Sequence, residues 1–176
     1  MNLTHLFNKH ASDKFTHGYG KFYEQHMPAK VNSLLEIGVL RGHSINAWKE
    51  AYPDAAIHGL DLFMENPVPT IEGVRFWKGN QLDYEVLENL RNNIKPQVII
   101  DDGSHNCIDH WVTLFSLVPA CEYYFIEDLH TCNEEFYRQG LKFEQTVLGA
   151  MVSGNFPFSY TLSQDQKIAI IRNLKS

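Results

Sequence analysis

Short apolar runs alternate with amphipathic segments along most of the chain, and this alternation constrains the fold more than any other feature. The runs are rich in Val, Ile and Leu and end in polar or turn residues, as buried strands do. The segments between them carry apolar residues at helical spacing. The predicted strands span residues 33–39, 56–62, 74–78, 97–100, 123–126, 158–163 and 167–172, and the predicted helices span residues 3–9, 19–27, 44–51, 84–93, 107–117 and 134–152.

Strands that alternate with helices predict an α/β fold, in which helices cover both faces of a mainly parallel sheet. The last two strands differ, because only the polar turn 164–166 joins them, and this turn is too short for a crossover helix. They should therefore pair antiparallel. The expected architecture is a seven-stranded sheet that is parallel except at its C-terminal strand.

The composition fits one domain, residues 1–176. The chain is 44% hydrophobic, enough for one core, and its net charge of −6 does not suit nucleic acid as the main partner. No run of about 18 apolar residues predicts a membrane span, and the first residues form no signal core. The three cysteines, Cys107, Cys121 and Cys132, have no paired spacing. The protein is therefore expected in the reduced cytoplasm.

Acidic side chains follow two of the predicted strands. In the segment VIIDDGSH, Asp101 and Asp102 follow the apolar residues and His105 comes three residues later. In the segment FIEDLHT, Glu127 and Asp128 follow the apolar residues. Ligands of open α/β sheets bind at the carboxyl ends of the strands, so these side chains should converge there. Carboxylates suit a hard divalent cation, and a nearby His can take a proton. The sequence therefore predicts an active site.

Simpler interpretations of these residues remain open. Asp101 can cap a turn, and its side chain should point away from that of Asp102, because neighbours on a strand face opposite ways. His105 can be an ordinary residue at a helix start, and His130 can lie at the surface. A zinc site of Cys107, His110, His130 and Cys132 is conceivable, but their spacing matches no zinc motif.

The loop after the first strand predicts a cofactor site. Gly38 and Gly42 allow a sharp turn and a close approach of the backbone to a ligand, and a helix N-terminus follows. Asp61 ends the second strand, 23 residues after Gly38, where a carboxylate can accept hydrogen bonds from two ribose hydroxyls. This pattern favours a nucleoside-type cofactor. The alternative is a tight turn with an acidic strand cap.

Six segments together resemble the class I S-adenosylmethionine-dependent methyltransferases, and more specifically the metal-dependent sugar O-methyltransferases of macrolide biosynthesis. They are SDKFTHGYGKFY, LLEIGVLRGHSINAWKEAYP, HGLDL, GNQLD, IIDDGSH and IEDLHT, between residues 12 and 131. The resemblance implies a Rossmann-like fold, S-adenosylmethionine and Mg²⁺ as cofactors, and a sugar-containing acceptor. Three departures are Asn80 where an acidic residue is common, a short glycine loop, and the expected lack of an extra N-terminal domain.

The resemblance also implies a role for each matching residue. Magnesium would be held by Asp102, Glu127 and Asp128, with His105 as the general base. Residues 1–30 would cap the cofactor, with His17, Tyr19, Tyr23 and His26 either forming this lid or packing as ordinary amphipathic residues. The segment 131–154 should frame the acceptor pocket. The residues expected to bind the cofactor are Glu36, Gly38, Gly42 and Ser44 near its methionine end, Asp61 on the ribose, Asn80 and Gln81 beside the adenine, and Asp102.

Other functions stay open. A catechol or another small molecule can be the acceptor, and the sheet can also serve a metal-independent methyltransferase, a metal-assisted hydrolase or a non-catalytic cofactor-binding protein. The non-catalytic cofactor-binding protein is disfavoured, because a protein that only binds a cofactor needs neither a base nor three carboxylates. A homo-oligomer is possible.

Overall fold

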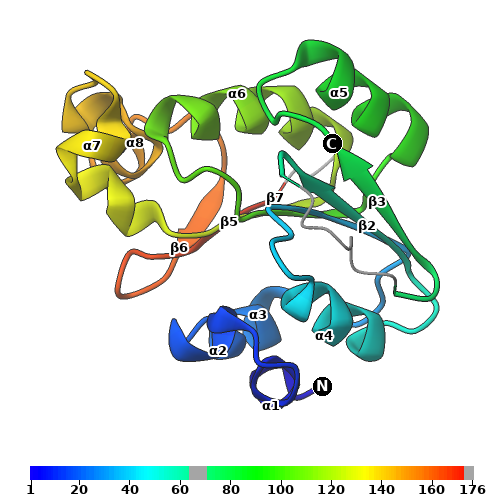
Figure 1. Cartoon of the computed structure of the whole chain (residues 1–176). Coiled ribbons are helices and arrows are strands. Elements are labelled where there is room, and N and C mark those ends of the chain that lie inside the picture. Colours follow the sequence, from blue (N-terminus) through cyan, green and yellow to red (C-terminus); the bar gives the residue numbers. More distant parts are fainter. Residues whose placement is uncertain (64–70, 173–176) are drawn as a thin grey trace.

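A computed structural model describes residues 1–63 and 71–172 and contains a seven-stranded sheet in the order β3-β2-β1-β4-β5-β7-β6 (Figure 1). All neighbouring pairs from β3 to β5 are parallel, and β7 runs antiparallel to both β5 and β6. This confirms the predicted sheet and its closing hairpin. The strands are β1 Ser33–Ile37, β2 Ala56–Asp61, β3 Val74–Lys78, β4 Val98–Asp101, β5 Tyr123–Ile126, β6 Tyr160–Leu162 and β7 Ala169–Arg172.

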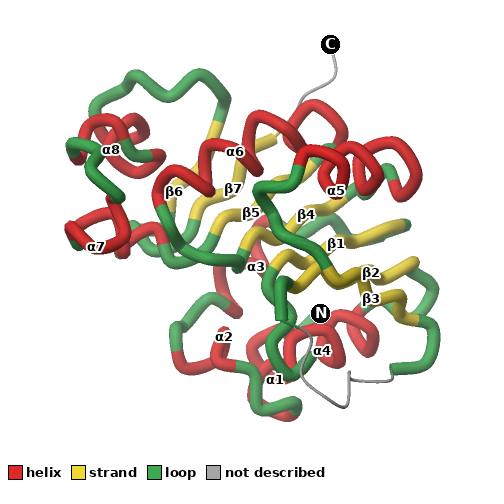
Figure 2. The backbone as a smooth tube through the Cα atoms, turned by 45° about the horizontal axis from the view of Figure 1, so that its top comes forward, coloured by secondary structure: helices red, strands yellow, loops and turns green. Residues whose placement is uncertain are grey.

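Helices cover both faces of the sheet, as Figure 2 shows from a second direction. One face carries α1 (Leu3–Lys9), α2 (Asp13–Thr16), α3 (Gly20–His26) and α4 (His43–Ala51). The other carries α5 (Tyr84–Asn89), which continues as a π-helical turn over Leu90–Ile94, and α6 (Cys107–Leu117), followed by a 3₁₀ turn over Val118–Ala120. No helix within the described ranges is long and apolar enough to cross a membrane.

Each face of the sheet has its own hydrophobic core. Leu34 on β1 packs with Phe7 and Trp48 from the N-terminal helices, whereas the next residue, Leu35, packs with Leu114 of α6 on the opposite face. Successive strand residues point to opposite faces, so a strand covered on both sides is apolar at most of its positions. This is why the central strands read as continuous apolar runs.

The chain reverses its direction of travel across the sheet at β1, which lies between β2 and β4. At this position Gly38 N donates to Leu60 O at 2.9 Å, and Asp102 N donates to Ile37 O at 2.9 Å. The carboxyl ends of the three strands therefore open into one crevice, the usual ligand position of such sheets.

The long helix predicted for residues 134–152 is wrong. Its span contains α7 (Glu135–Arg138), a 3₁₀ turn over Phe143–Gln145 and α8 (Val147–Val152), and another 3₁₀ turn, Leu129–Asn133, precedes it. Gln139 and Gly140 have φ values of 51° and 86°, which end α7, and Thr146 begins α8 by accepting a hydrogen bond from Gly149 N. The apolar spacing continued through this break and concealed it.

Candidate active site

Four carboxylates from three neighbouring strands meet at the carboxyl edge of the sheet. Glu36 lies on β1, Asp102 follows β4, and Glu127 and Asp128 follow β5. The side chains of Glu36 and Glu127 are at most 1% exposed, whereas those of Asp102 and Asp128 are 18% and 12% exposed. The predicted convergence is confirmed for Asp102, His105, Glu127 and Asp128. It is wrong for Asp101, whose carboxylate accepts hydrogen bonds from Thr113 and Tyr124 instead.

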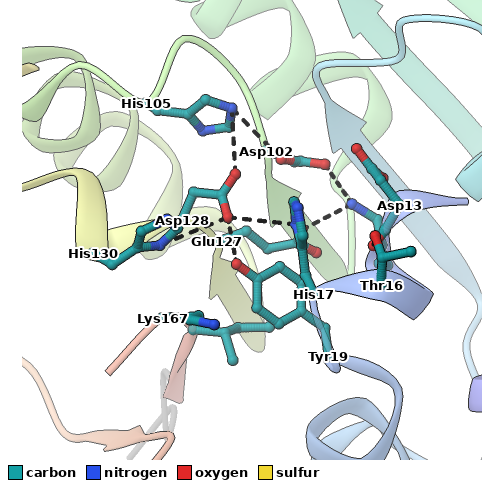
Figure 3. A network of polar contacts seen from close by, with 12 residues as sticks. Asp13, Thr16, His17, Tyr19, Asp102, His105, Glu127, Asp128, His130 and Lys167 are labelled. Atoms are coloured by element: carbon teal, nitrogen blue, oxygen red, sulfur yellow. Dashed lines mark hydrogen bonds and ion pairs between the residues drawn. The ribbon is translucent and has the colours of Figure 1, made fainter. Parts of the chain in front are cut away.

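One group of candidate metal ligands stands out among the described residues. Asp102, His105 and Asp128 each offer an atom within 4.8 Å of the others. His105 Nε2 lies 3.5 Å from Asp128 Oδ2 and 4.0 Å from Asp102 Oδ1 (Figure 3). Glu127, which the resemblance also assigns to the metal, does not belong to this group, since its carboxylate contacts Lys14 and Tyr23.

Lys14, at the start of the short helix α2, is a site residue that the sequence did not predict. Its side chain is 1% exposed, and its Nζ lies 2.5 Å from Asp102 Oδ2, 3.0 Å from Glu127 Oε2 and 3.2 Å from Glu36 Oε1. Burial alone lowers the pKa of Lys14, but the three carboxylates outweigh this effect and raise the pKa well above its ordinary value. The ammonium therefore stays charged.

The carboxylates around Lys14 are crowded with negative charge. Burial raises the pKa of Glu127 well above its usual range, the charge of Asp102 adds to the rise, and Lys14 only partly opposes it. Burial likewise raises the pKa of Glu36 and of Asp102 against the opposing effect of Lys14. A single ammonium does not balance this cluster, so the site favours a further cation.

Two tyrosines tie the N-terminal segment to the same cluster. Tyr19 donates from its hydroxyl to Asp128 Oδ1, and Tyr23 donates to Glu127 Oε1. Burial and the adjacent carboxylate raise the pKa of each tyrosine, so both remain neutral donors. His17 Nδ1 and His130 Nδ1 lie 3.7 and 4.0 Å from Asp128 Oδ1 (Figure 3). The N-terminal aromatic residues thus contact the acids directly.

The glycine loop is packed tightly against the end of β4. Gly38 has a φ of 86°, and a Cβ on it would lie 1.8 Å from the carbonyl oxygen of Asp102. Only glycine fits there, for both reasons. Gly42, with a φ of 74°, forms the N-cap of α4. The loop therefore brings the backbone of β1 against the metal-ligand candidate Asp102.

Asp61 holds this loop in place through its carboxylate. Oδ2 accepts hydrogen bonds from Val39 N and Leu40 N at 2.8 Å each, and Oδ1 accepts from Phe63 N at 2.8 Å. The interpretation of Asp61 as a cap thus has direct support. A carboxylate has about four lone-pair positions, so capacity for a ribose hydroxyl remains.

Two adjoining cavities follow the loop. The first, about 510 Å³, is lined by Gly38, Ser44, Asp61, Asp102 and His105 among others, and the second, about 380 Å³, by Asp61, Asn80 and Gln81 among others. Glu36 is fully buried and lines neither cavity, but its Oε2 accepts a hydrogen bond of 2.8 Å from the Oγ of Ser44, which lines the first.

The side-chain amides of Asn80 and Gln81, in the second cavity, differ in their hydrogen bonds. Asn80 Oδ1 accepts from Leu82 N in a local turn. Gln81 Oε1 accepts from Ser104 N at 2.9 Å, while its Nε2 is buried without a hydrogen-bond partner. An unpaired buried amide donor is costly, so it favours a ligand that accepts a hydrogen bond in this cavity.

Two alternatives from the sequence are resolved. Asp101 points away from the cluster, and its Oδ2 accepts hydrogen bonds of 2.5 Å from Thr113 and Tyr124. The zinc site is not formed, because the described residues with converging ligand atoms are Asp102, His105 and Asp128 alone. Cys107 and Cys132 are instead free, buried thiols with Sγ atoms 3.1 Å apart.

Comparisons with known proteins agree with this geometry. No family model matches the chain. The mycinamicin VI 2''-O-methyltransferase of Micromonospora griseorubida is 30% identical over 146 residues, 74% of this chain and 36% of the relative. The L-olivosyl-oleandolide 3-O-methyltransferase of Streptomyces antibioticus is 31% identical over 146 residues, 73% of this chain and 37% of the relative.

A solved structure shares the whole fold. The MycE methyltransferase from the mycinamycin biosynthetic pathway, in complex with Mg, SAH and mycinamycin VI, has a TM-score of 0.82 at 24% identity, over 100% of this chain and 55% of its own. This chain spans roughly a third of the length of the two curated relatives. The chain therefore has the fold of the class I S-adenosylmethionine-dependent methyltransferases, and its sequence is related to the macrolide-sugar O-methyltransferases over about a third of their length.

Proposed function

We propose that this protein is an S-adenosylmethionine-dependent and Mg²⁺-dependent O-methyltransferase that acts on a sugar hydroxyl of a glycosylated small molecule. The convergence of Asp102, His105 and Asp128 beside the glycine-loop cavity carries the proposal. It puts candidate metal ligands, a base and a cofactor cavity in one crevice. The names of the two curated relatives, which act on mycinamicin VI and L-olivosyl-oleandolide, support the acceptor class.

The two cavities suit the two ends of the cofactor. The methionine end would lie over Gly38, Gly42 and Ser44, with Glu36 beneath, and the adenine would lie beside Asn80 and Gln81. Asp61 lines both cavities, so the ribose between them can reach its carboxylate. The unpaired Nε2 of Gln81 supplies a donor for an adenine nitrogen.

The residues at the crevice fit Mg²⁺, which prefers oxygen ligands. Asp102 and Asp128 would hold the ion, and Glu127 would join them by turning one oxygen from its buried partners. When bound, the ion lowers the pKa of a coordinated hydroxyl and orients it, and the cofactor supplies the methyl group. A vicinal diol can coordinate through both oxygens, which favours sugars.

His105 would remove the proton from the acceptor hydroxyl. Its Nε2 is the ring atom that faces Asp102 and Asp128, so it points toward the place where the acceptor oxygen must lie. The carboxylate of Asp128 can stabilise the imidazolium that forms. Methyl transfer is in line, so the remaining task of these residues is to fix the angle and distance of attack.

Two segments would enclose the reaction. Residues 1–30 cap the crevice through Tyr19 and Tyr23, and residues 131–154 frame the acceptor. We place the protein in the cytoplasm, where its three cysteines, which form no disulfide, remain reduced.

A turnover assay tests the proposal. The protein is incubated with S-adenosylmethionine, Mg²⁺ and a panel of macrolide glycosides, sugar nucleotides and catechols, and release of S-adenosylhomocysteine is measured. A glycoside or sugar nucleotide should turn over, and EDTA should stop the reaction. Turnover of catechols alone would refute the acceptor class, and calorimetry without any cofactor binding would refute the proposal as a whole.

A further inference from the structure

The carboxylate of Asp102 faces two different positions. Its Oδ2 lies 2.5 Å from Lys14 Nζ, in the interior, whereas its Oδ1 faces His105 Nε2 at 4.0 Å, toward the crevice. The crevice position is the one where ligand atoms of Asp102, His105 and Asp128 converge. Asp102 thus bridges an inner position, occupied by an ammonium, and an outer position suited to a metal ion.

The inner position has the ligands of a cation site. Three oxygens surround Lys14 Nζ, at 2.5, 3.0 and 3.2 Å, and each comes from a different carboxylate on a different strand end. The ammonium has three N–H donors for these three acceptors. In two-metal enzymes, by comparison, bridging oxygen ligands hold two ions about 3.5–4 Å apart.

We propose that Lys14 is the built-in second cation of this centre. Its ammonium takes the place and the carboxylate ligands of a second divalent ion, so the protein binds one exchangeable ion and not two. This inference rests on the proposed function, which supplies the ion at the outer position. Lys14 acts as a positioning residue, because it reaches the reaction only through the carboxylates that it holds.

Desolvation and charge explain why a lysine serves here. The side chains of Glu36 and Glu127 are almost completely buried, so an uncompensated charge on them is costly. Mg²⁺ gives up its water reluctantly and suits such an interior position poorly. An ammonium delivered by the chain itself is placed during folding. One lysine and one divalent ion then offset most of the charge of the four carboxylates.

The number of bound Mn²⁺ ions tests this role. Calorimetry and EPR of the wild-type protein titrated with Mn²⁺ should give one ion per chain, even at saturation. Lys14→Ala removes the ammonium and opens its space, so it should bind two ions, and the second should broaden the EPR signal of the first. Lys14→Met is the matched control, because its uncharged side chain still fills the space, and it should bind at most one.

The outcomes separate the two proposals. A wild-type protein with two ions, or a folded Lys14→Ala protein with one, overturns the role of Lys14 and leaves the proposed function intact. A wild-type protein that binds no Mn²⁺ overturns the metal in the proposed function and this inference with it. A Lys14→Ala protein that folds only when Mn²⁺ is added supports the inference, because the ions then replace the lost charge. Glu127→Gln in the Lys14→Ala background should return the count to one.

Discussion

His105 and Asp128 face each other across the crevice, with His105 Nε2 3.5 Å from Asp128 Oδ2, and both have left-handed backbones with φ values of 59° and 54°. Such values are uncommon outside glycine, although His and Asp adopt them more readily than most residues. The two loops each accept this conformation, and the result is a close approach of the two functional side chains.

The His105→Asn variant tests the general base. Asn tolerates the left-handed backbone, so the loop should survive the change. We expect kcat to fall by about 10²–10⁴-fold, with little change in the affinities for S-adenosylhomocysteine and Mg²⁺. The acidic limb of the pH–rate profile should also vanish, since the neutral imidazole is the active form. If metal affinity falls together with kcat, His105 is a metal ligand and not the base.

Neutral substitutions of the carboxylates should weaken metal binding. Asp102→Asn and Asp128→Asn should each weaken Mn²⁺ binding in calorimetry and abolish turnover, because a neutral amide is a poor ligand for a hard cation. Glu127→Gln should weaken Mn²⁺ binding if Glu127 turns to the ion, as proposed. Glu85→Gln, an exposed position on α5, is the control and should change neither property. Full activity in EDTA would contradict the metal dependence.

Substitution of Asp61 should lower the affinity for the cofactor. Asp61→Ala removes the acceptor for a ribose hydroxyl, so binding of S-adenosylhomocysteine should weaken by about 1.5–3 kcal/mol. Asp61→Asn keeps an oxygen for the N–H groups of Val39 and Leu40, so it separates loop support from ribose binding. The exposed Asp54→Ala serves as control. An unchanged dissociation constant in folded Asp61→Ala would remove Asp61 from the cofactor site.

Two glycines form a matched pair for a stability measurement. Gly18 and Gly38 have similar φ values, 78° and 86°, but a Cβ at Gly18 meets nothing within 4 Å, while one at Gly38 meets the Asp102 carbonyl. Gly18→Ala should therefore cost only the backbone strain, about 1–2 kcal/mol in urea unfolding. Gly38→Ala should cost more and should also weaken Mn²⁺ binding. Equal losses in the two variants would contradict this account.

His26 should make the folded protein less stable in mild acid. Arg172 donates to His26 Nδ1 at 3.0 Å, because a guanidinium has only donors, and burial together with this positive charge lowers the pKa of His26. Near pH 6.5, His26 therefore becomes protonated in the unfolded chain while it stays neutral in the folded chain. Stability is full above that pH and falls as the pH drops toward the lowered value.

The His26→Gln variant measures this contribution. Glutamine keeps an acceptor for Arg172 but does not titrate, so urea unfolding of the variant should lose less stability between pH 7.5 and about 5.5 than the wild type. The exposed His5→Gln variant serves as control. Parallel pH curves for wild type and His26→Gln would refute the link.

The sequence predicted the sheet well because period and composition are local. Every strand from β1 to β5 falls within two residues of its expected bounds. The central strands β1, β4 and β5 were the clearest, because buried parallel strands are mostly apolar. The segment 134–152 failed because Gln139 and Gly140 interrupt a pattern whose apolar spacing continues beyond them. The spacing of apolar residues does not reveal such a helix end, because the end is set by the backbone angles of these two residues.

The candidate site was predictable only in part. Asp102, His105, Glu127 and Asp128 stand at strand ends, where topology brings distant residues together. Lys14 gave no such signal, because lysines are rarely buried and its three partners lie 22 to 113 residues away. Only the SDKF segment in the resemblance pointed to this region, and it did not say which residue mattered.

The packing of Gly38 against the Asp102 carbonyl limits how this protein can be redesigned. No side chain fits between the two, so the β1 end of the loop and the β4 strand end form one rigid corner. Directed evolution toward a cofactor analogue with a larger sulfonium substituent would have to enlarge the crevice elsewhere. Libraries should tolerate variation at three positions that line the cavity farther along the loop, namely Leu40, Arg41 and His43.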